Sequence, residues 1–386
     1  MPEISPLTWT VGIAALVIGI LAGHFGWGKR WPHTLSKLHP DYLTGLDYLV
    51  TEQPDRALDM FLKLMDANAD TIETHFSLGS LYRRRGEVER AIRIHQNLLA
   101  RATLAPEHRE QALLALAQDY LRAGLLDRAE GLFQQVSEVP RLRASALDSL
   151  RGVYERQHEW QQALDVFRLL ARIQAAPPRM VAAHYLCELA ALAIERGEFE
   201  PARRLLRDAR GEVTPFPRAA VLRAQIAERE ANVGLAIRLL RHALEESPKL
   251  IQQELPHLLQ LVAVDERERV LADLVAQARS RDRGELKRLV FAAMLADLTE
   301  APALRAAIED VFANDETLQA VWRSVPRDDA PRRDSRRVAQ EIGALLANAE
   351  KYRCKECGFS GRNFYWHCPA CHAWDSFETY ALVKLG

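Results

Sequence analysis

The sequence has little that would mark an enzyme or a nucleic-acid-binding protein. Its 51 Lys and Arg side chains are balanced by 52 Asp and Glu, which leaves a formal net charge of −1. Phosphate binding needs concentrated positive charge, so this balance gives no reason to expect a nucleic-acid partner. Residues 38–313 contain no nucleophile elbow, phosphate-binding loop or HExxH motif. We therefore expect a protein that is not an enzyme and has no catalytic residues.

Cysteine is scarce, and its distribution is uneven. Of five cysteines, only Cys187 lies outside the last part of the chain, in an apolar helical stretch where we expect a small buried hydrophobic residue. The other four, Cys354, Cys357, Cys368 and Cys371, form two CxxC pairs separated by ten residues. In a reducing compartment such pairs bind metal rather than form disulfides. Their spacing predicts one metal ion held by four thiolates, about 2.3 Å from each sulfur.

Residues 351–386 are predicted to fold around this metal as a small module with two knuckles. Gly358 allows the tight turn of the first knuckle, and His372 stands where a second glycine is expected. Six aromatic residues are expected to supply the small core: Tyr352, Phe359, Phe364, Tyr365, Trp366 and Trp374. The spacing and the aromatics resemble rubredoxin, in which similar knuckles hold one iron. Zinc is favoured here because no electron donor or acceptor is evident, and iron is the alternative.

Charge is absent from a long apolar run near the N-terminus. No charged residue occurs from Ile4 to Gly28, and the 21 residues from Leu7 to Trp27 would span about 31 Å as a helix. A cleaved signal peptide needs positive charge before the run, yet the only charged side chain there is Glu3. Lys29 and Arg30 follow it instead. The positive-inside rule therefore predicts a retained single-pass anchor over residues 1–31, with the bulk of the chain in the cytoplasm.

A pattern with a period of about 34 residues occupies residues 38–250. Tyrosine stands nine residues before the first four repeated alanines, and a bulky side chain stands four after each. The alanines, spaced by 34, 38, 34, 39 and 34 residues, are Ala57, Ala91, Ala129, Ala163, Ala202 and Ala236. This order resembles the tetratricopeptide repeat. Gly86, Gly124 and Gly197 mark the turns between paired helices.

The resemblance implies an all-α fold, a tetratricopeptide-like α-solenoid whose concave surface binds peptide segments or other proteins. Residues 251–324 continue the helical period without the signature and are predicted to be degenerate repeats or a cap. Residues 325–350 read as a linker followed by a short helix that docks the metal module on the array. The array histidines, among them His95 and His184, lack metal-ligand spacing and are expected at the surface or the edge of the core.

Three features in one order carry a further resemblance over the full length. They are the apolar segment followed by Lys29-Arg30, the repeats, and the terminal block YRCKECGF…YWHCPACHAW. Together they resemble the lipopolysaccharide assembly protein B family of Gram-negative bacteria. The resemblance implies an inner-membrane adaptor that lowers lipopolysaccharide synthesis by promoting degradation of the lipid A-committing deacetylase by the membrane protease FtsH. It also implies the gathering of other lipopolysaccharide synthesis or export proteins. A membrane-tethered, rubredoxin-like electron carrier is the competing hypothesis.

Overall fold

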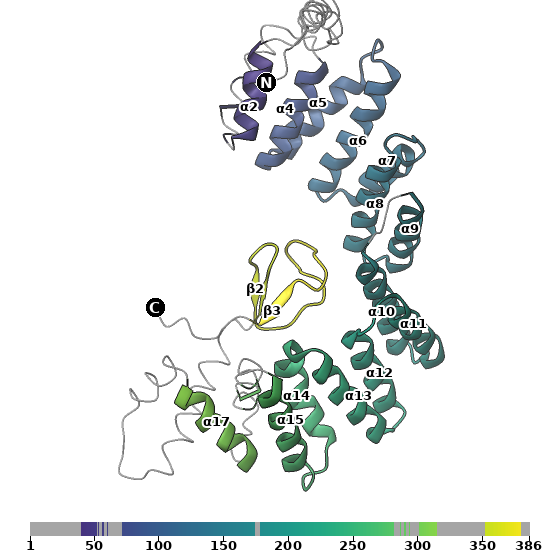
Figure 1. The fold of residues 1–386 in the computed structure, drawn as a ribbon. Helices are drawn as coiled ribbons and strands as arrows, with labels where there is room; N and C mark the ends of the chain where they lie inside the picture. The colour runs from purple at the N-terminus through teal and green to yellow at the C-terminus, as the bar shows by residue number, and fades with distance from the viewer. Residues whose placement is uncertain are drawn as a thin grey trace, which may run out of the picture. The chain divides into compact units, whose positions relative to one another are not determined.

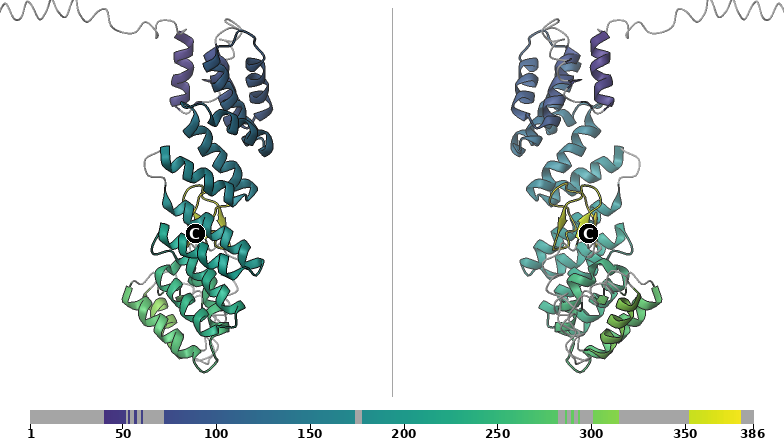
Figure 2. Two further views of the ribbon diagram at one scale, coloured as in Figure 1. Left: turned by 90° about the vertical axis from the view of Figure 1, so that its right-hand side faces the viewer. Right: turned by 90° about the vertical axis from the view of Figure 1, so that its left-hand side faces the viewer.

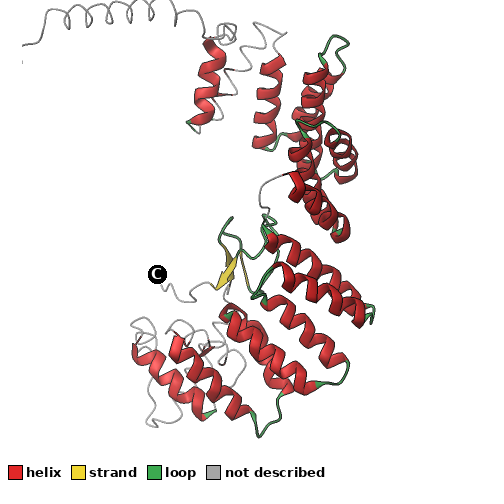
Figure 3. Cartoon of the chain, turned by 45° about the vertical axis from the view of Figure 1, so that its right-hand side comes forward, coloured by secondary structure: helices red, strands yellow, loops and turns green. Residues whose placement is uncertain are grey.

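The computed structural model describes residues 40–51, single positions from 53 to 60, residues 72–173 and 178–281, single positions from 286 to 293, and residues 301–314 and 352–379. The chain divides into two units, Met1–Ser149 and Leu150–Gly386. Within the described residues, everything before residue 315 that has regular structure is helical, and strands occur only in the C-terminal segment (Figure 3).

The first unit is built from helix pairs. Helix α2 covers Pro40–Val50 and is followed by the pair α4 (Ile72–Arg85) and α5 (Val88–Leu99). The next pair is α6 (Pro106–Arg122) and α7 (Leu126–Ser137), after which α8 (Arg143–Gln157) begins (Figure 1). Each second helix packs on the first helix of its own pair, and α5 also packs on α6.

The second unit continues with the same kind of pairs. It contains α9 (Trp160–Ile173), α10 (Arg179–Glu195), α11 (Phe199–Glu212), α12 (Pro217–Arg229), α13 (Val233–Glu246), the short 3-10 helix η2 (Pro248–Leu250), α14 (Ile251–Leu261), α15 (Arg267–Arg281) and α17 (Pro302–Asn314). Helices α10 and α11 pack together, as do α12 and α13, and α11 packs on α12. Figure 2 shows the helices in two further views.

The buried positions confirm the predicted repeat. All six signature alanines have no exposed surface, since each lies where two helices touch. The positions four residues later are also buried wherever they are described, from His95 to Leu240. Tyr82, Tyr120 and Tyr154 keep at most 8% of their surface exposed. The period therefore marks the contacts that one helix makes with the next, as stacked repeats require.

The turn between paired helices has one backbone geometry in five places. Gly86, Gly124 and Gly197 have φ angles of 83°, 75° and 78°, as the sequence predicted. His158 and Ala231 take the same place in two other pairs with φ of 59° and 58°. In every case the next N–H donates to the carbonyl of the tyrosine or alanine five residues back. This hydrogen bond requires a residue in the left-handed backbone conformation. Two of the turns have histidine or alanine there, which adopt this conformation less readily than glycine.

The expectation that the array histidines lie at the surface or core edge is wrong for three of them, and the first, His75, is 7% exposed. His95 is 1% exposed, and a side chain on Gly79 would collide with its ring. Its Nδ1 contacts the carboxylate of Asp119, which also accepts from Arg83 at 2.6 Å. His184 has no exposed surface at all. A histidine is buried in these places because a carboxylate or a guanidinium on a neighbouring helix satisfies one ring nitrogen.

The C-terminal module is a small antiparallel sheet with long connections. Its strands are β1 (Tyr352–Cys354), β2 (Ser360–Gly361) and β3 (Phe377–Thr379), in the order β2-β1-β3. Tyr352 pairs with Gly361 on one side, and Cys354 pairs with Phe377 on the other. The sheet brings the two ends of the module together, and the connection between β2 and β3 carries the second CxxC pair.

Several predicted segments lie outside the described residues. These are the anchor at residues 1–31 and the linker with its docking helix at residues 325–350. In the parts of the chain that the structure describes, no helix is both long enough and apolar enough to cross a membrane. The predicted domain boundaries stay predictions.

The shared turn geometry predicts that Ala231→Gly stabilises the second unit. Glycine removes the cost of the left-handed conformation at the price of more freedom in the unfolded chain, so we expect a gain of about 0.5 to 1 kcal/mol. The matched control is Gly197→Ala, which should lower stability by a similar amount. Thermal unfolding of the purified chain measures both. Equal melting temperatures for Gly197→Ala and the unchanged chain would show that the left-handed conformation at this turn does not cost stability in alanine.

A candidate metal centre docked on the repeat helices

The two CxxC pairs form knuckles with the same hydrogen bonds. In the first, the Cys354 N–H donates to the Phe359 carbonyl at 2.8 Å, and the Gly358 N–H donates to the Cys354 carbonyl at 3.0 Å. In the second, the Cys368 N–H donates to Ala373 and the His372 N–H donates to Cys368, both at 2.9 Å. Gly358 has a φ of 76° and His372 a φ of 60°. His372 therefore adopts the glycine geometry of the first knuckle.

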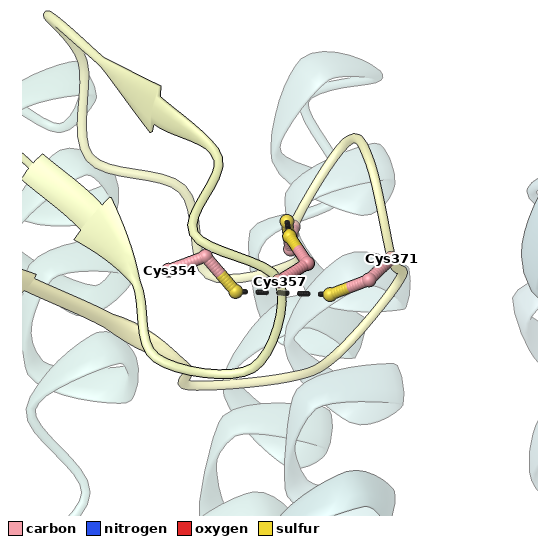
Figure 4. Close-up of side chains that lie close together, drawn as sticks. Cys354, Cys357 and Cys371 are labelled. Carbon is pink, nitrogen blue, oxygen red and sulfur yellow. Dashed lines mark hydrogen bonds between the residues drawn. The ribbon is translucent and has the colours of Figure 1, made fainter. Parts of the chain in front are cut away.

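The structure brings the four predicted cysteine sulfurs together. The Sγ atoms of Cys354, Cys357, Cys368 and Cys371 all lie within 4.8 Å of one another. The sulfurs of Cys354 and Cys371 are 3.7 Å apart, as are those of Cys357 and Cys368 (Figure 4). These distances are too long for disulfides. A tetrahedron with a metal about 2.3 Å from each sulfur has edges of about 3.8 Å, so the sulfur spacing fits a single metal ion.

The thiols of the cluster differ in how readily they ionise. Burial raises the pKa of Cys371 to about 12, and the neighbouring sulfurs add to the rise. Burial also acts to raise the pKa of Cys354, but contact with the Ser376 hydroxyl and hydrogen bonds from backbone N–H groups lower it to about 6. The Cys354 thiolate thus forms readily, whereas burial and the neighbouring sulfurs oppose ionisation of Cys371. Binding a metal ion to all four would release protons, because metal ligands must be deprotonated.

The core of the module is smaller than the sequence predicted. Tyr352, Phe364 and Phe377 are almost fully buried and pack edge to face. Phe359 and Tyr365, which were expected in this core, are 37% and 38% exposed. Tyr352, Phe364 and Phe377 belong to one apolar cluster with buried residues of α12 to α17. The module therefore completes its core by packing on the helices.

Trp374 makes the central contact between the module and the helices. Its indole N–H donates to the carboxylate of Glu155 on α8 at 3.0 Å. The ring stacks on His184 of α10 with centroids 4.8 Å apart and also on His367 with centroids 4.2 Å apart. Glu155 is 5% exposed, and it also accepts from Arg151 and from the hydroxyl of Tyr185. Three donors compensate this buried carboxylate, and one of them comes from the metal module.

Two cations hold the rest of the interface. Arg218 on α12 lies over Trp366 and Trp374, 5.7 and 5.8 Å from the ring centroids. Its guanidinium donates to Glu188 at 2.6 Å and to Nδ1 of His184 at 3.1 Å. Lys249 of η2 bonds Asp375 and lies over Phe364 and Trp366. Cations over aromatic faces are attracted by the ring quadrupole, more so where water is excluded.

Where the module meets the helices, a cavity of about 510 Å³ lies beside the second knuckle. Trp160 and Pro369 supply apolar walls, and His158, His367 and His372 supply ring nitrogens. The cavity is large enough for a protein side chain or a short loop.

Sequence reasoning found the metal ligands but missed the residues that receive the module. Glu155, His184 and Arg218 lie on three helices that are distant in sequence, and nothing in their local pattern distinguishes them from ordinary helix residues. Trp374 was assigned to the module core, although it lies at the interface. Cys187 was predicted to be a buried hydrophobic residue, and this is confirmed, since it has no exposed surface and burial raises its pKa to about 12.

Fold and site together define a class: a tetratricopeptide-repeat protein with a C-terminal four-cysteine metal-binding domain. Residues 70–141 match the family model of the tetratricopeptide repeat, and residues 352–379 match that of the rubredoxin metal binding domain. Over nearly its whole length the chain resembles lipopolysaccharide assembly protein B, as the sequence pattern predicted.

Relatives of that name come from two genera. The protein of Escherichia coli strain K12 is 29% identical over 93% of this chain and 95% of its own length. That of Haemophilus influenzae is 28% identical over 93% of this chain and 96% of its own length. Among solved structures, part of a repeat-containing protein from Cytophaga hutchinsonii is 12% identical, covers 72% of this chain and 98% of its own, and has a TM-score of 0.41.

The buried His184 predicts that docking of the module weakens in acid. Burial lowers the pKa of His184 well below 6.5, and Arg218, Lys249 and His367 lower it further. Undocking would expose His184 to water and remove His367, which raises the pKa of His184 toward its ordinary value, so the undocked form binds more protons in acid. The free energy that favours the docked form should then fall by at most about 1.4 kcal/mol for each pH unit as the pH is lowered.

Hydrogen exchange of α10 and of β1 at a series of pH values measures this loss, with metal content read in parallel. The control is His184→Gln, which keeps an acceptor for Arg218 but cannot titrate. If the substituted chain shows the same pH dependence as the unchanged one, His184 is not the responsible group.

Proposed function

We propose that this protein is an adaptor of the inner membrane that delivers the lipid A-committing deacetylase to the membrane protease FtsH and thereby lowers lipopolysaccharide synthesis. Resemblance to lipopolysaccharide assembly protein B over 93% of the chain is the observation that carries the proposal. Repeat helices supply long surfaces for proteins rather than a reaction centre. Other lipopolysaccharide synthesis or export proteins are further candidate partners.

In this proposal the metal module is part of the binding surface. Cys354, Cys357, Cys368 and Cys371 would hold one zinc ion, which is redox-inert and would shape the knuckles without taking part in a reaction. The module lies against α8, α10 and α12 through Trp374 and Trp366. A partner segment seated in the cavity between Trp160 and Pro369 would contact both the helices and the module. Recognition would then depend on the docked, metal-bound state.

The predicted anchor at residues 1–31 would place these surfaces beside the protease. Confinement in one membrane raises the effective concentration of two partners without any new contact. The positive charges of Lys29 and Arg30 would keep the repeats and the module on the cytoplasmic side.

Deletion of residues 1–28 tests the tethering step. We expect the shortened chain to keep its metal and its helices but no longer to lower deacetylase levels in cells, because the effective concentration is lost. Immunoblotting of the deacetylase gives the readout. The matched control replaces residues 4–28 with an unrelated apolar span of the same length, which should restore activity. Full activity of the shortened chain would refute tethering.

A rubredoxin-like electron carrier is the second candidate function. The exposure of Cys357 and Cys371 favours it, since a redox partner could approach a metal from that side. The two functions require different metals, because zinc has no redox chemistry. We expect the aerobically purified full chain to be colourless and to contain one equivalent of zinc by elemental analysis. A red chain whose visible absorption bleaches reversibly on reduction would instead identify the carrier.

A further inference from the structure

Helix α11 carries a row of arginines on one face. Arg203, Arg207 and Arg210 are spaced by four and three residues, which places them on the same side of a helix over a length of about 10 Å. Arg223 of the neighbouring helix α12 joins them, and all four side chains line one groove of about 330 Å³. The residues that line the groove come from helices α11, α12 and α13, which are labelled in Figure 1.

The arginines of the groove outnumber its carboxylates. Among the described residues, Glu230 is the only acidic one that lines it, and Glu230 pairs with Arg203, which also bonds Glu200 at 2.5 Å. Within the described parts of the chain, the side chains of Arg207, Arg210 and Arg223 have no ion pair or hydrogen bond. The pKa of Arg223 is lowered by burial and by the charges of Arg210, Arg203 and Arg207. Like charges held together in this way lower stability.

The floor of the groove is apolar. It consists of Leu206, Ile226, Ala227, Leu235 and Leu239, contributed by all three helices. An apolar floor with a cationic rim matches a ligand that has an apolar group between negative charges. Arginine is also the side chain best suited to carboxylates, because its planar fork donates two parallel hydrogen bonds.

We propose that this groove binds an acidic segment of a partner protein, with an apolar side chain on the floor and carboxylates on Arg207, Arg210 and Arg223. A peptide fits better than a single phosphate group, because the cations extend over about 10 Å along α11. Carboxylates on successive side chains of a peptide span that length. The apolar floor of the groove would contribute nothing to the binding of a phosphate group.

This inference deepens the proposed adaptor function by locating one surface that receives a partner. It is tested without protease or deacetylase, so its failure would leave the adaptor proposal standing. Failure of the anchor experiment would likewise leave peptide binding unaffected.

Peptide binding to the full chain in nonionic detergent is the test. The probe is a short fluorescent peptide of glutamates with leucines interspersed, and its binding is followed by fluorescence anisotropy. We expect binding that weakens with salt, that fails when glutamine replaces glutamate, and that drops when serine replaces leucine. Arg207→Gln and Arg223→Gln should each weaken binding roughly tenfold.

The matched control is Arg204→Gln, because Arg204 is an exposed residue of the same helix that does not line the groove. Its binding should change by less than about twofold, since exposed charges contribute little. Arg223→Gln should also raise the melting temperature, because it relieves the repulsion among the four guanidinium groups, and this readout shows that weaker binding does not come from unfolding.

Binding to vesicles of phosphatidylglycerol tests the alternative that the groove binds anionic lipid headgroups. Should the chain fail to bind the acidic peptide, or bind it equally well with and without the groove arginines, the proposal is wrong. Loss of vesicle binding in Arg207→Gln and Arg223→Gln, with no peptide binding by the unchanged chain, would assign the groove to lipid headgroups and also overturn it.

Discussion

The stacking of Trp374 on His367 and on His184 is the contact that ties the metal module to the repeat helices of the second unit. One indole joins residues 219 positions apart in sequence and donates to the buried Glu155. Without that donor Glu155 would lose one of its three partners, and without the ring His184 would lose the surface that covers it. A buried carboxylate and a buried neutral histidine are stable only when such partners are present, so the docked arrangement is specific.

This contact makes the metal centre part of the repeat array. Trp374 lies three residues beyond Cys371, in the segment that the second knuckle orients. Tyr352, Phe364 and Phe377 share their core with α12 to α17. A module of this size has too little apolar surface to fold alone, and the metal and the helices each supply part of what is missing. Metal loss would therefore disturb the helices that receive the module as well as the module itself.

Sequence reasoning succeeded where the pattern was local or periodic. The six alanines are buried, and so are Tyr82, Tyr120 and Tyr154, because stacked helices impose the same contact in each unit; Tyr48 in the first unit is only partly buried. The cysteines were identifiable because tetrahedral coordination dictates both the residue type and the CxxC spacing. The same reasoning failed at His158 and Ala231, whose left-handed turns have no glycine to mark them. It also failed at His95 and His184, whose burial depends on partners in other helices.

By itself the sequence determined the class of protein: repeat helices followed by four clustered thiols, since periodicity and ligand spacing are properties of a few neighbouring residues. The tertiary structure alone decided where the module docks and which side chains receive it. Glu155, His184 and Arg218 come from α8, α10 and α12, and only the stacking of those helices brings them to Trp374. In the same way, stacking sets Arg223 of α12 beside the arginine row of α11. Such contacts depend on the packing of distant helices, which no local pattern encodes.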